Sequence, residues 1–285
     1  MPQAEENYVT IPYQYTQNGL IHLPIQIDGV SYLVKLDTGT VSDTLFLHRD
    51  ILKKHKATPL EEKAIRCNVK GKLFTTQFFQ VKSVNLGAYQ LVNFKGEEYI
   101  PWLVRGPRRD DGTLEKEKID GIIGFNFFAL LKIKKLIIDY RKNNLILVKE
   151  GGLPAEYKNM SWSSVPFTFE AEIADLDSPE ITFHGSYVRK GHEDIPLKLA
   201  LDLGDSFPID LSQKWLERHH LLPIEKLREK KGILRLGDEF QKELAGGRYG
   251  MLGELVSERG ALGNEFFKEN VLVLDLEKKV LEIAQ

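Results

Sequence analysis

A repeated pattern constrains the fold of this chain more than any other feature of its sequence. The stretches "VKLDTGTVS" (residues 34–42) and "LALDLGDSF" (residues 199–207) both place Asp-x-Gly directly after an apolar run. Two further landmarks recur in the same order: "GIIGFNFF" is matched by "GALGNEFF", and "LIIDYRKNNLIL" is matched by "LVLDLEKKVLEI". One Asp-Thr-Gly arises easily by chance, but three ordered landmarks found twice predict two copies of one folding unit.

The two predicted units divide the chain near residue 150. The stretch "EGGLPAEYKNMS" (residues 150–161) has the Gly, Pro and Asn content that is typical of a linker. We therefore expect an N-terminal unit in residues 1–150 and a C-terminal unit in residues 151–285. A chain of 285 residues is long enough for two such domains.

Local patterns predict mostly β-structure. Asp28-Gly29 lies between two apolar runs, which predicts a tight hairpin. Residues 73–94 are rich in Val, Phe, Thr and Tyr and predict further strands. Helical periodicity is confined to two short segments, residues 43–56 and residues 211–222. The expected fold class is therefore all-β with short helices.

Several repeated residues have structural interpretations. Ser212 is a candidate N-cap for the second helix. Asp139 and Asp275 each precede a polar turn, and we interpret them as turn residues. The paired phenylalanines in the second landmark, residues 127–128 and 266–267, are expected in the core.

Charge and composition exclude several classes of partner. The net charge of −2 gives no reason to expect nucleic acid or an anionic membrane as a partner. One cysteine excludes an internal disulfide and a cysteine-based metal cluster. No apolar stretch reaches the roughly 20 residues of a membrane helix. The first residues lack the apolar core of a signal peptide; we expect an exported protein, periplasmic or secreted, with its signal removed, and a cytoplasmic protein is the alternative.

The repeated Asp residues predict acid–base chemistry. Two copies of one unit tend to pack around a pseudo-two-fold axis, which would bring Asp37 and Asp202 together. Two carboxyl groups about 3 Å apart share a proton over a range of acidic pH. One carboxylate can then accept a proton from water while the other acts as an acid toward a substrate carbonyl. Such a pair hydrolyses an amide with no covalent intermediate, no metal and no cofactor.

At this point the sequence resembles a known family. "LDTGT", "DGIIGFNFF" and "IIDYRKNNLIL" are similar to one lobe of the aspartic peptidases, especially the bacterial retropepsin-like group. The resemblance implies two closed-barrel-like lobes around a pseudo-two-fold cleft, with the catalytic Asp37 and Asp202 at its floor. It also implies a peptide or protein substrate. A monomer is sufficient for a complete site, because one chain carries both Asp residues.

The resemblance further implies a hairpin flap over the substrate. The candidate in the first unit is the turn formed by Asn68, Val69, Lys70 and Gly71. Residues 244–250 occupy the corresponding stretch of the second unit.

The two active-site loops differ from each other. The first loop has Thr38, Gly39 and Thr40, where the second loop has Leu203, Gly204 and Asp205. Leu203 lacks the hydroxyl that links the two loops across the axis in the family, a loss of about 0.5–1.5 kcal/mol. We expect Thr38 to bond to backbone alone.

Asp205 adds a third acid beside the pair, which raises a neighbouring pKa or requires a cation. We expect the Asp205 side chain to turn outward, capping its turn or pairing with a basic group. The alternative is a site that differs from a standard peptidase.

Three functions remain open on the sequence alone. The first is an aspartic endopeptidase that works best in acid, with Asp37 and Asp202 as its catalytic pair. The second is a catalytically inactive protein that binds a peptide or glycan in the same cleft, which Leu203 and Asp205 motivate. The third is a phosphoryl-transfer enzyme, but it would need strands alternating with helices, and the strand-rich pattern argues against it.

Overall fold

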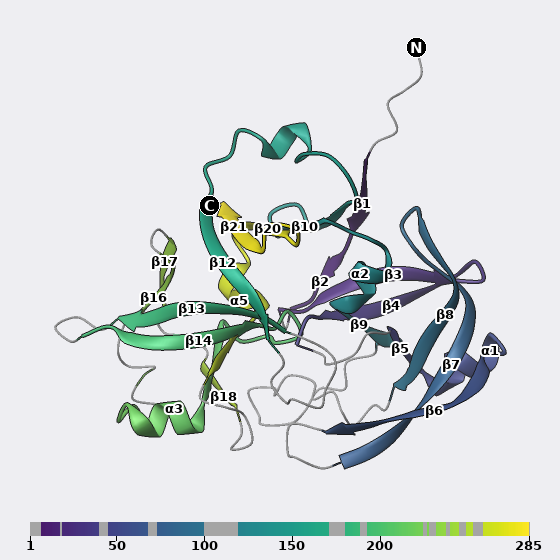
Figure 1. Cartoon of the computed structure of the whole chain (residues 1–285), viewed down its shortest axis with the longest axis horizontal. Helices are drawn as coiled ribbons and strands as arrows, with labels where there is room; N and C mark the ends of the chain where they lie inside the picture. Colours follow the sequence, from purple (N-terminus) through teal and green to yellow (C-terminus); the bar gives the residue numbers. More distant parts are fainter. Residues whose placement is uncertain are drawn as a thin grey trace.

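The structure is a computed structural model, and it describes residues 7–17, 19–39, 45–67, 73–99, 119–170, 180–188, 193–224, 227, 232–237, 240–244, 249–252 and 259–284. Two β-sheets dominate this part of the chain, and short helices connect some of their strands (Figure 1). The mainly β fold class expected from the sequence is therefore confirmed. Among the residues that the structure describes, no helix has the length and apolar character that a membrane crossing requires.

The first sheet, as far as the structure describes it, has eight strands from the N-terminal part of the chain. Their order across the sheet is β2-β3-β4-β9-β5-β8-β7-β6. Their bounds are β2 Gln14–Tyr15, β3 Ile21–Ile27, β4 Val30–Asp37, β5 Leu45–His48, β6 Thr58–Cys67, β7 Leu73–Leu86, β8 Tyr89–Tyr99 and β9 Gly121–Gly124.

The second sheet has thirteen strands within the described ranges. Their bounds are β1 Tyr8–Pro12, β10 Lys135–Asp139, β11 Asn144–Val148, β12 Ser163–Glu170, β13 Glu180–Val188, β14 Ile195–Leu201, β15 Ile209–Ser212, β16 Ile233–Leu236, β17 Phe240–Glu243, β18 Tyr249–Leu252, β19 Gly260–Leu262, β20 Val271–Asp275 and β21 Val280–Ala284. Its main path runs β1-β11-β10-β20-β21-β12-β13-β14-β19-β15-β18, and β16 and β17 branch from β13.

Both ends of the chain contribute to one part of the second sheet. Strands β1, β11 and β10 come from the first part of the sequence, and β20, β21 and β12 come from the second part. The two sets meet where β10 pairs antiparallel with β20, with Ile137 opposite Val273. Since β10 and β20 carry the repeated third landmark, this junction has the symmetry that a duplicated unit predicts. The boundary at residue 150 itself stays a prediction.

A three-strand unit is repeated around the two Asp-x-Gly loops. Strand β9 lies between β4 and β5, parallel to β4 and antiparallel to β5. Strand β19 lies in the same way between β14 and β15. The register also matches, because Leu36 pairs with Ile123 where Leu201 pairs with Leu262. The first two sequence landmarks therefore have equivalent places in the fold.

The predicted turns are present. Asp28 and Gly29 connect β3 to β4 with φ angles of 49° and 76°, the left-handed values that a tight hairpin turn requires. Asp139 accepts hydrogen bonds from the backbone N–H groups of Arg141 and Lys142 through Oδ1. Asp275 accepts one from Lys278 in the same way. Both aspartates therefore cap turns, as interpreted from the sequence.

The two expected helices are shorter than predicted. Helix α1 spans Arg49–Lys54 and helix α3 spans Gln213–Arg218, because the apolar residues before each helix form β5 and β15. Both strands are largely buried between neighbours. Strand β5 begins with a continuous apolar run, which is typical of such strands, whereas β15 alternates apolar and polar residues. Ser212 is the N-cap of α3, accepting a hydrogen bond from Trp215 N.

The number of residues that separates equivalent positions of the two units changes inside the active-site loops. Asp37 and Asp202 are 165 residues apart, an offset at which Ile51 would correspond to Leu216. The two helices are instead offset by 164 residues, so Ile51 corresponds to Trp215 and Leu52 to Leu216. The second loop is therefore one residue shorter than the first, and the repeat is exact in order but not in spacing.

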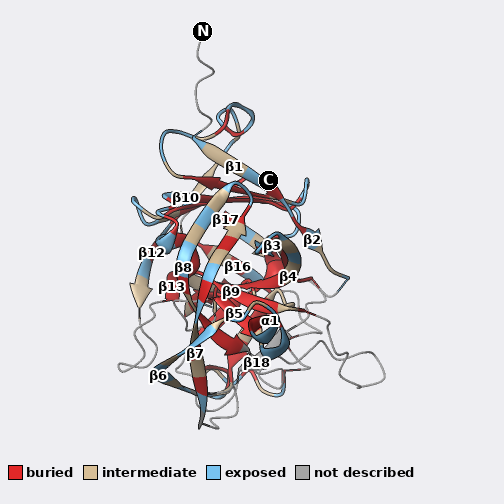
Figure 2. Cartoon of the chain, turned by 90° about the vertical axis from the view of Figure 1, so that its right-hand side faces the viewer, coloured by how far each residue is buried: buried red, intermediate tan, exposed pale blue. Residues whose placement is uncertain are grey.

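The paired phenylalanines lie in the core, as expected. Phe127 and Phe128, in α2 (Asn126–Leu130), are fully buried, and Phe266 and Phe267, in α5 (Asn264–Phe267), are almost completely buried. Figure 2 shows buried residues on β10 and on the central strands β4, β5 and β9. The predicted linker is also partly packed: the short helix η2 (Ala155–Tyr157) buries Tyr157, whose hydroxyl donates to Asp139 Oδ2.

Candidate active site

The two Asp-x-Gly loops meet. Asp37 ends β4, and Asp202 directly follows β14. A Cβ atom on Gly204 would lie 2.2 Å from Cγ of Asp37, and a Cβ atom on Gly39 would lie 2.6 Å from Cγ of Asp202. Each glycine therefore lies against the carboxyl group of the opposite loop, and no side chain fits at either position. The structure thus brings the two carboxyl groups together at the contact between the repeated units.

Thr38 joins the first loop to the second. Its hydroxyl donates to the carbonyl oxygen of Leu201 at 2.7 Å and accepts from the backbone N–H of Leu203 at 2.9 Å. Thr38 is buried, and Leu203 is fully buried in the hydrophobic core. One hydroxyl therefore holds the backbone on both sides of Asp202, although Leu203 provides no hydroxyl in return.

A buried asparagine, which the sequence reasoning missed, supports the second loop. The Asn264 side chain donates from Nδ2 to the carbonyl oxygen of Leu203. Its Oδ1 atom accepts a hydrogen bond from the Tyr140 hydroxyl at 2.7 Å. Asn264 is fully buried. The sequence signal was a polar residue within the apolar second landmark, and its role is to hold a loop that lacks a second threonine.

Lys35 was also missed, and it lies beside the carboxyl pair. Side chains two residues apart on a strand point to the same face, so Lys35 and Asp37 lie together on β4. Lys35 Nζ is 2.7 Å from Asp37 Oδ2 and donates to the carbonyl oxygen of Gly204 at 3.2 Å. Only 6% of the lysine side chain is exposed. The signal was a lysine inside an apolar run, two residues before the motif.

The pair is electrostatically asymmetric. Burial raises the pKa of Asp202 well above its ordinary value, and the negative charges of Asp37 and Asp205 raise it further. Lys35 and the backbone N–H of Gly204 oppose this rise without cancelling it. Asp202 therefore retains its proton at pH values where an exposed aspartate has lost it.

Asp205 caps its turn but does not turn outward. Its Oδ1 atom accepts from the backbone N–H of Phe207 at 3.0 Å, and the residue is half-buried. Burial raises the pKa of Asp205, while the Phe207 N–H, a hydrogen bond with Asp210 and the charge of Lys35 lower it. Asp205 thus raises the pKa of Asp202 and is itself affected by the charge of Lys35. The expected cap of its turn is present, but the half-buried side chain does not turn outward.

Some residues named from the sequence lie outside the described ranges: Thr40 of the first loop, and Asn68, Val69, Lys70 and Gly71 of the expected flap. Residues 245–248, in the corresponding stretch of the second unit, lie outside them as well. Their roles remain predictions. Within the described part of the chain, no three His, Cys, Asp or Glu side chains gather as a metal site.

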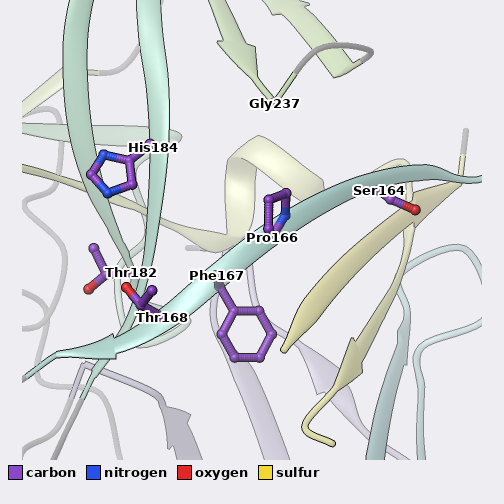
Figure 3. A pocket seen from close by; sticks show the side chains of 7 residues that line it. All are labelled: Ser164, Pro166, Phe167, Thr168, Thr182, His184 and Gly237. Atoms are coloured by element: carbon purple, nitrogen blue, oxygen red, sulfur yellow. The ribbon is translucent and has the colours of Figure 1, made fainter. Parts of the chain in front are cut away.

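A separate cavity lies away from the carboxyl pair. Its volume is about 500 Å³, and Figure 3 shows its lining residues on β12 and β13, with Gly237 in the turn between β16 and β17. His184, Thr168 and Thr182 are among them, and neither Asp37 nor Asp202 is. This cavity does not belong to the candidate active site.

We expect Thr38→Val to lower the free energy of unfolding by about 2 kcal/mol, because it removes the acceptor of the buried Leu203 N–H and the donor to Leu201 O. Thr38→Ser keeps the hydroxyl and should retain most of that stability. Urea unfolding of both variants measures the difference. Equal midpoints for Val and Ser would show that the hydroxyl does not join the loops.

Two solved structures resemble this fold over nearly its whole length. Conglutin gamma, a basic 7S globulin from lupine seeds, superposes with a TM-score of 0.65 at 12% identity, covering 98% of this chain and 95% of that chain. Basic 7S globulin from soybean gives a TM-score of 0.61 at 11% identity, with the same coverage. The chain has the pepsin-like two-lobed fold. At this identity the likeness establishes the fold alone.

By sequence, no family model and no curated protein matches this chain. The two-lobed fold predicted from the repeat is confirmed, and the function rests on the residues of the site.

Proposed function

We propose that this protein hydrolyses peptide bonds in acid, with Asp37 and Asp202 as its catalytic pair. The observation that carries the proposal is the reciprocal contact of the two loops, in which each glycine lies against the other loop's carboxyl group. This arrangement supports the sharing of a proton between two carboxyl groups, the state that aspartate-pair hydrolysis needs. The raised pKa of Asp202 is consistent with that state.

The two carboxyl groups have different tasks in the proposed reaction. Lys35 engages Oδ2 of Asp37, and the carboxylate accepts a proton from water through Oδ1. The water oxygen then forms a bond to the peptide carbonyl carbon, while Asp202 donates its proton to the carbonyl oxygen. When the resulting tetrahedral species collapses, the C–N bond breaks and the amine nitrogen takes up the proton held by Asp37. Asp202 regains its proton from the gem-diol, so the pair returns to its starting state.

A second candidate is a non-catalytic protein that binds a peptide or glycan between the lobes. Leu203 favours it, because this buried residue replaces one of the two hydroxyls expected near the pair. The comparisons favour it as well, because both globulins are non-catalytic proteins of the aspartic-protease-like fold. The chain itself carries both carboxyl groups, each against the glycine of the opposite loop, which is why we place hydrolysis first.

A digestion experiment distinguishes the two candidates. A mixed peptide library is incubated with the protein from about pH 3 to pH 7, and cleavage is followed by mass spectrometry. We expect cleavage in the acidic range, and Asp37→Asn and Asp202→Asn should each reduce its rate by about 10²–10⁴-fold, the usual contribution of general acid–base catalysis.

Asp50→Asn is a matched control, because Asp50 is an exposed carboxylate whose ion-pair partner is His48. Cleavage that persists in either variant of the pair would refute the catalytic proposal. Library peptides retained without cleavage at every pH would support the binding protein instead.

A further inference from the structure

Nothing in the repeat itself says which carboxyl of the pair is the base. The two Asp residues end equivalent strands, and β9 and β19 support them in the same register. In a symmetric pair, the shared proton can reside on either residue. A difference between the two strands is therefore needed to fix its position.

Lys35 supplies that difference. At the matching place on β14, two residues before Asp202, the chain has Ala200. Lys35 is buried, and its Nζ is 2.7 Å from Asp37 Oδ2. A buried cation at this distance strongly favours the charged form of a carboxyl group. The cation acts mainly on Asp37, because the carboxylate of Asp37 lies at ion-pair distance from it.

The same ammonium group also contacts the opposite lobe. Lys35 Nζ donates to the carbonyl oxygen of Gly204, two residues after Asp202. The backbone N–H of Gly204 donates to Asp202 Oδ1 at 2.9 Å. One residue of the second loop thus links Lys35 and Asp202, so the position of the cation is set by both lobes.

Other charged groups near Lys35 do not restore the symmetry. Asp205 faces it from the second loop, and Asp205 is hydrogen-bonded to Asp210 on β15. On β3, His22 lies opposite Lys35 in the strand pairing and is buried. The neighbour on β9, Ile122, carries no charge. Of these titratable groups, Lys35 and His22 can carry a positive charge, whereas Asp205 and Asp210 are acidic.

We propose that Lys35 is a positioning residue that keeps Asp37 ionised, so that Asp37 is the base and Asp202 the acid. This proposal rests on the proposed function for the roles of base and acid, but the charge assignment stands without it. Lys35 also makes the active protonation state persist at lower pH than the carboxyl pair alone allows. The pair then keeps one ionised carboxylate in conditions where two unassisted buried carboxyls would both be protonated.

The test compares three chains: wild type, Lys35→Gln, which removes the charge but keeps an amide donor, and Lys35→Arg, which keeps the charge. The aspartate carboxyl carbons are labelled with ¹³C and titrated by NMR, with assignment from the Asp37→Asn and Asp202→Asn spectra. In the wild type we expect Asp37 to ionise at lower pH than Asp202. In Lys35→Gln the first ionisation of the pair should move upward by about 1–3 pH units. In Lys35→Arg it should stay near the wild-type position.

Activity against the peptide library gives an independent readout. If the protein cleaves peptides, the acidic limb of kcat/KM should move upward with the NMR titration in Lys35→Gln and recover in Lys35→Arg. A wild type in which Asp202 ionises before Asp37 overturns the inference, even if the variants fail to fold. So does a Lys35→Gln titration that matches the wild type. If no chain cleaves peptides but the titration moves, hydrolysis is refuted and the assignment by Lys35 stands.

Discussion

Replacing Asp202 by Asn should stabilise this protein at neutral pH, while replacing Asp37 by Asn should destabilise it. The folded-state pKa of Asp202 lies above its unfolded value, which is about 3.9. Well below this value both states hold the proton, and Asp202 costs nothing. As pH rises, the unfolded chain releases this proton while the folded protein retains it. Stability therefore falls until pH passes the folded pKa.

Asp202→Asn removes this loss, because the amide does not ionise. Its Oδ1 atom can still accept the Gly204 N–H bond that the aspartate accepts. We expect a gain of at least about 1 kcal/mol at pH 7, since one unit of pKa difference corresponds to about 1.4 kcal/mol. The gain should vanish well below pH 4.

Asp37→Asn has the opposite sign because it leaves Lys35 without its closest counter-charge. Removing one partner of a buried ion pair costs about 3 kcal/mol or more. The double variant Lys35→Met with Asp37→Asn is the matched control. It should recover most of the loss, since no buried charge is then left alone.

Chemical unfolding at pH 3.5 and pH 7 measures all three variants. Equal stabilities of Asp37→Asn and Asp202→Asn at pH 7 would contradict the asymmetry of the pair. A gain for Asp202→Asn that is the same at both pH values would show that the removed proton is not the cause.

The second large effect is expected at Gly204. Gly204→Ala places a Cβ atom 2.2 Å from Asp37 Cγ and 2.4 Å from both carboxylate oxygens. The carboxylate cannot simply swing away, because Lys35 holds it. The two loops must therefore separate, and we expect a loss of about 3 kcal/mol or more together with any hydrolytic activity.

Gly152→Ala is the matched control for this change. No atom lies within 4 Å of a Cβ atom built at Gly152. Its unfolding midpoint should equal that of the wild type or exceed it slightly. A Gly204→Ala protein as stable as Gly152→Ala would show that the two loops are not in contact.

Much of the architecture could be predicted from the sequence, because it depends on patterns within a few consecutive residues. The Asp28-Gly29 hairpin follows from residues that tolerate positive φ, and the buried phenylalanine pairs follow from their apolar surface. The two helices are shorter than predicted, because the residues just before each of them pair as a largely buried strand. Whether such a segment becomes strand or helix is decided by its neighbours, which are distant in the sequence.

Only part of the candidate active site could be predicted from the sequence. The repeat predicted Asp37 and Asp202 as a pair, and in the structure each carboxyl group lies against the glycine of the opposite loop. Lys35 and Asn264 were missed, although each is a polar residue within an apolar landmark. Their importance depends on which atoms they reach, Asp37 Oδ2 in one case and the Leu203 carbonyl in the other.

The sequence by itself determined that the chain has two related β-units, each with an aspartate at the end of a buried strand. The spacing of apolar residues and the residue types of turns act within a few residues, so they can be recognised without knowledge of the rest of the fold. Only the tertiary structure decided that Lys35 faces Asp37 while Asp205 stays beside the pair. Charges act through space in a buried environment, and the distance and burial that set their strength exist only once the two lobes are packed together.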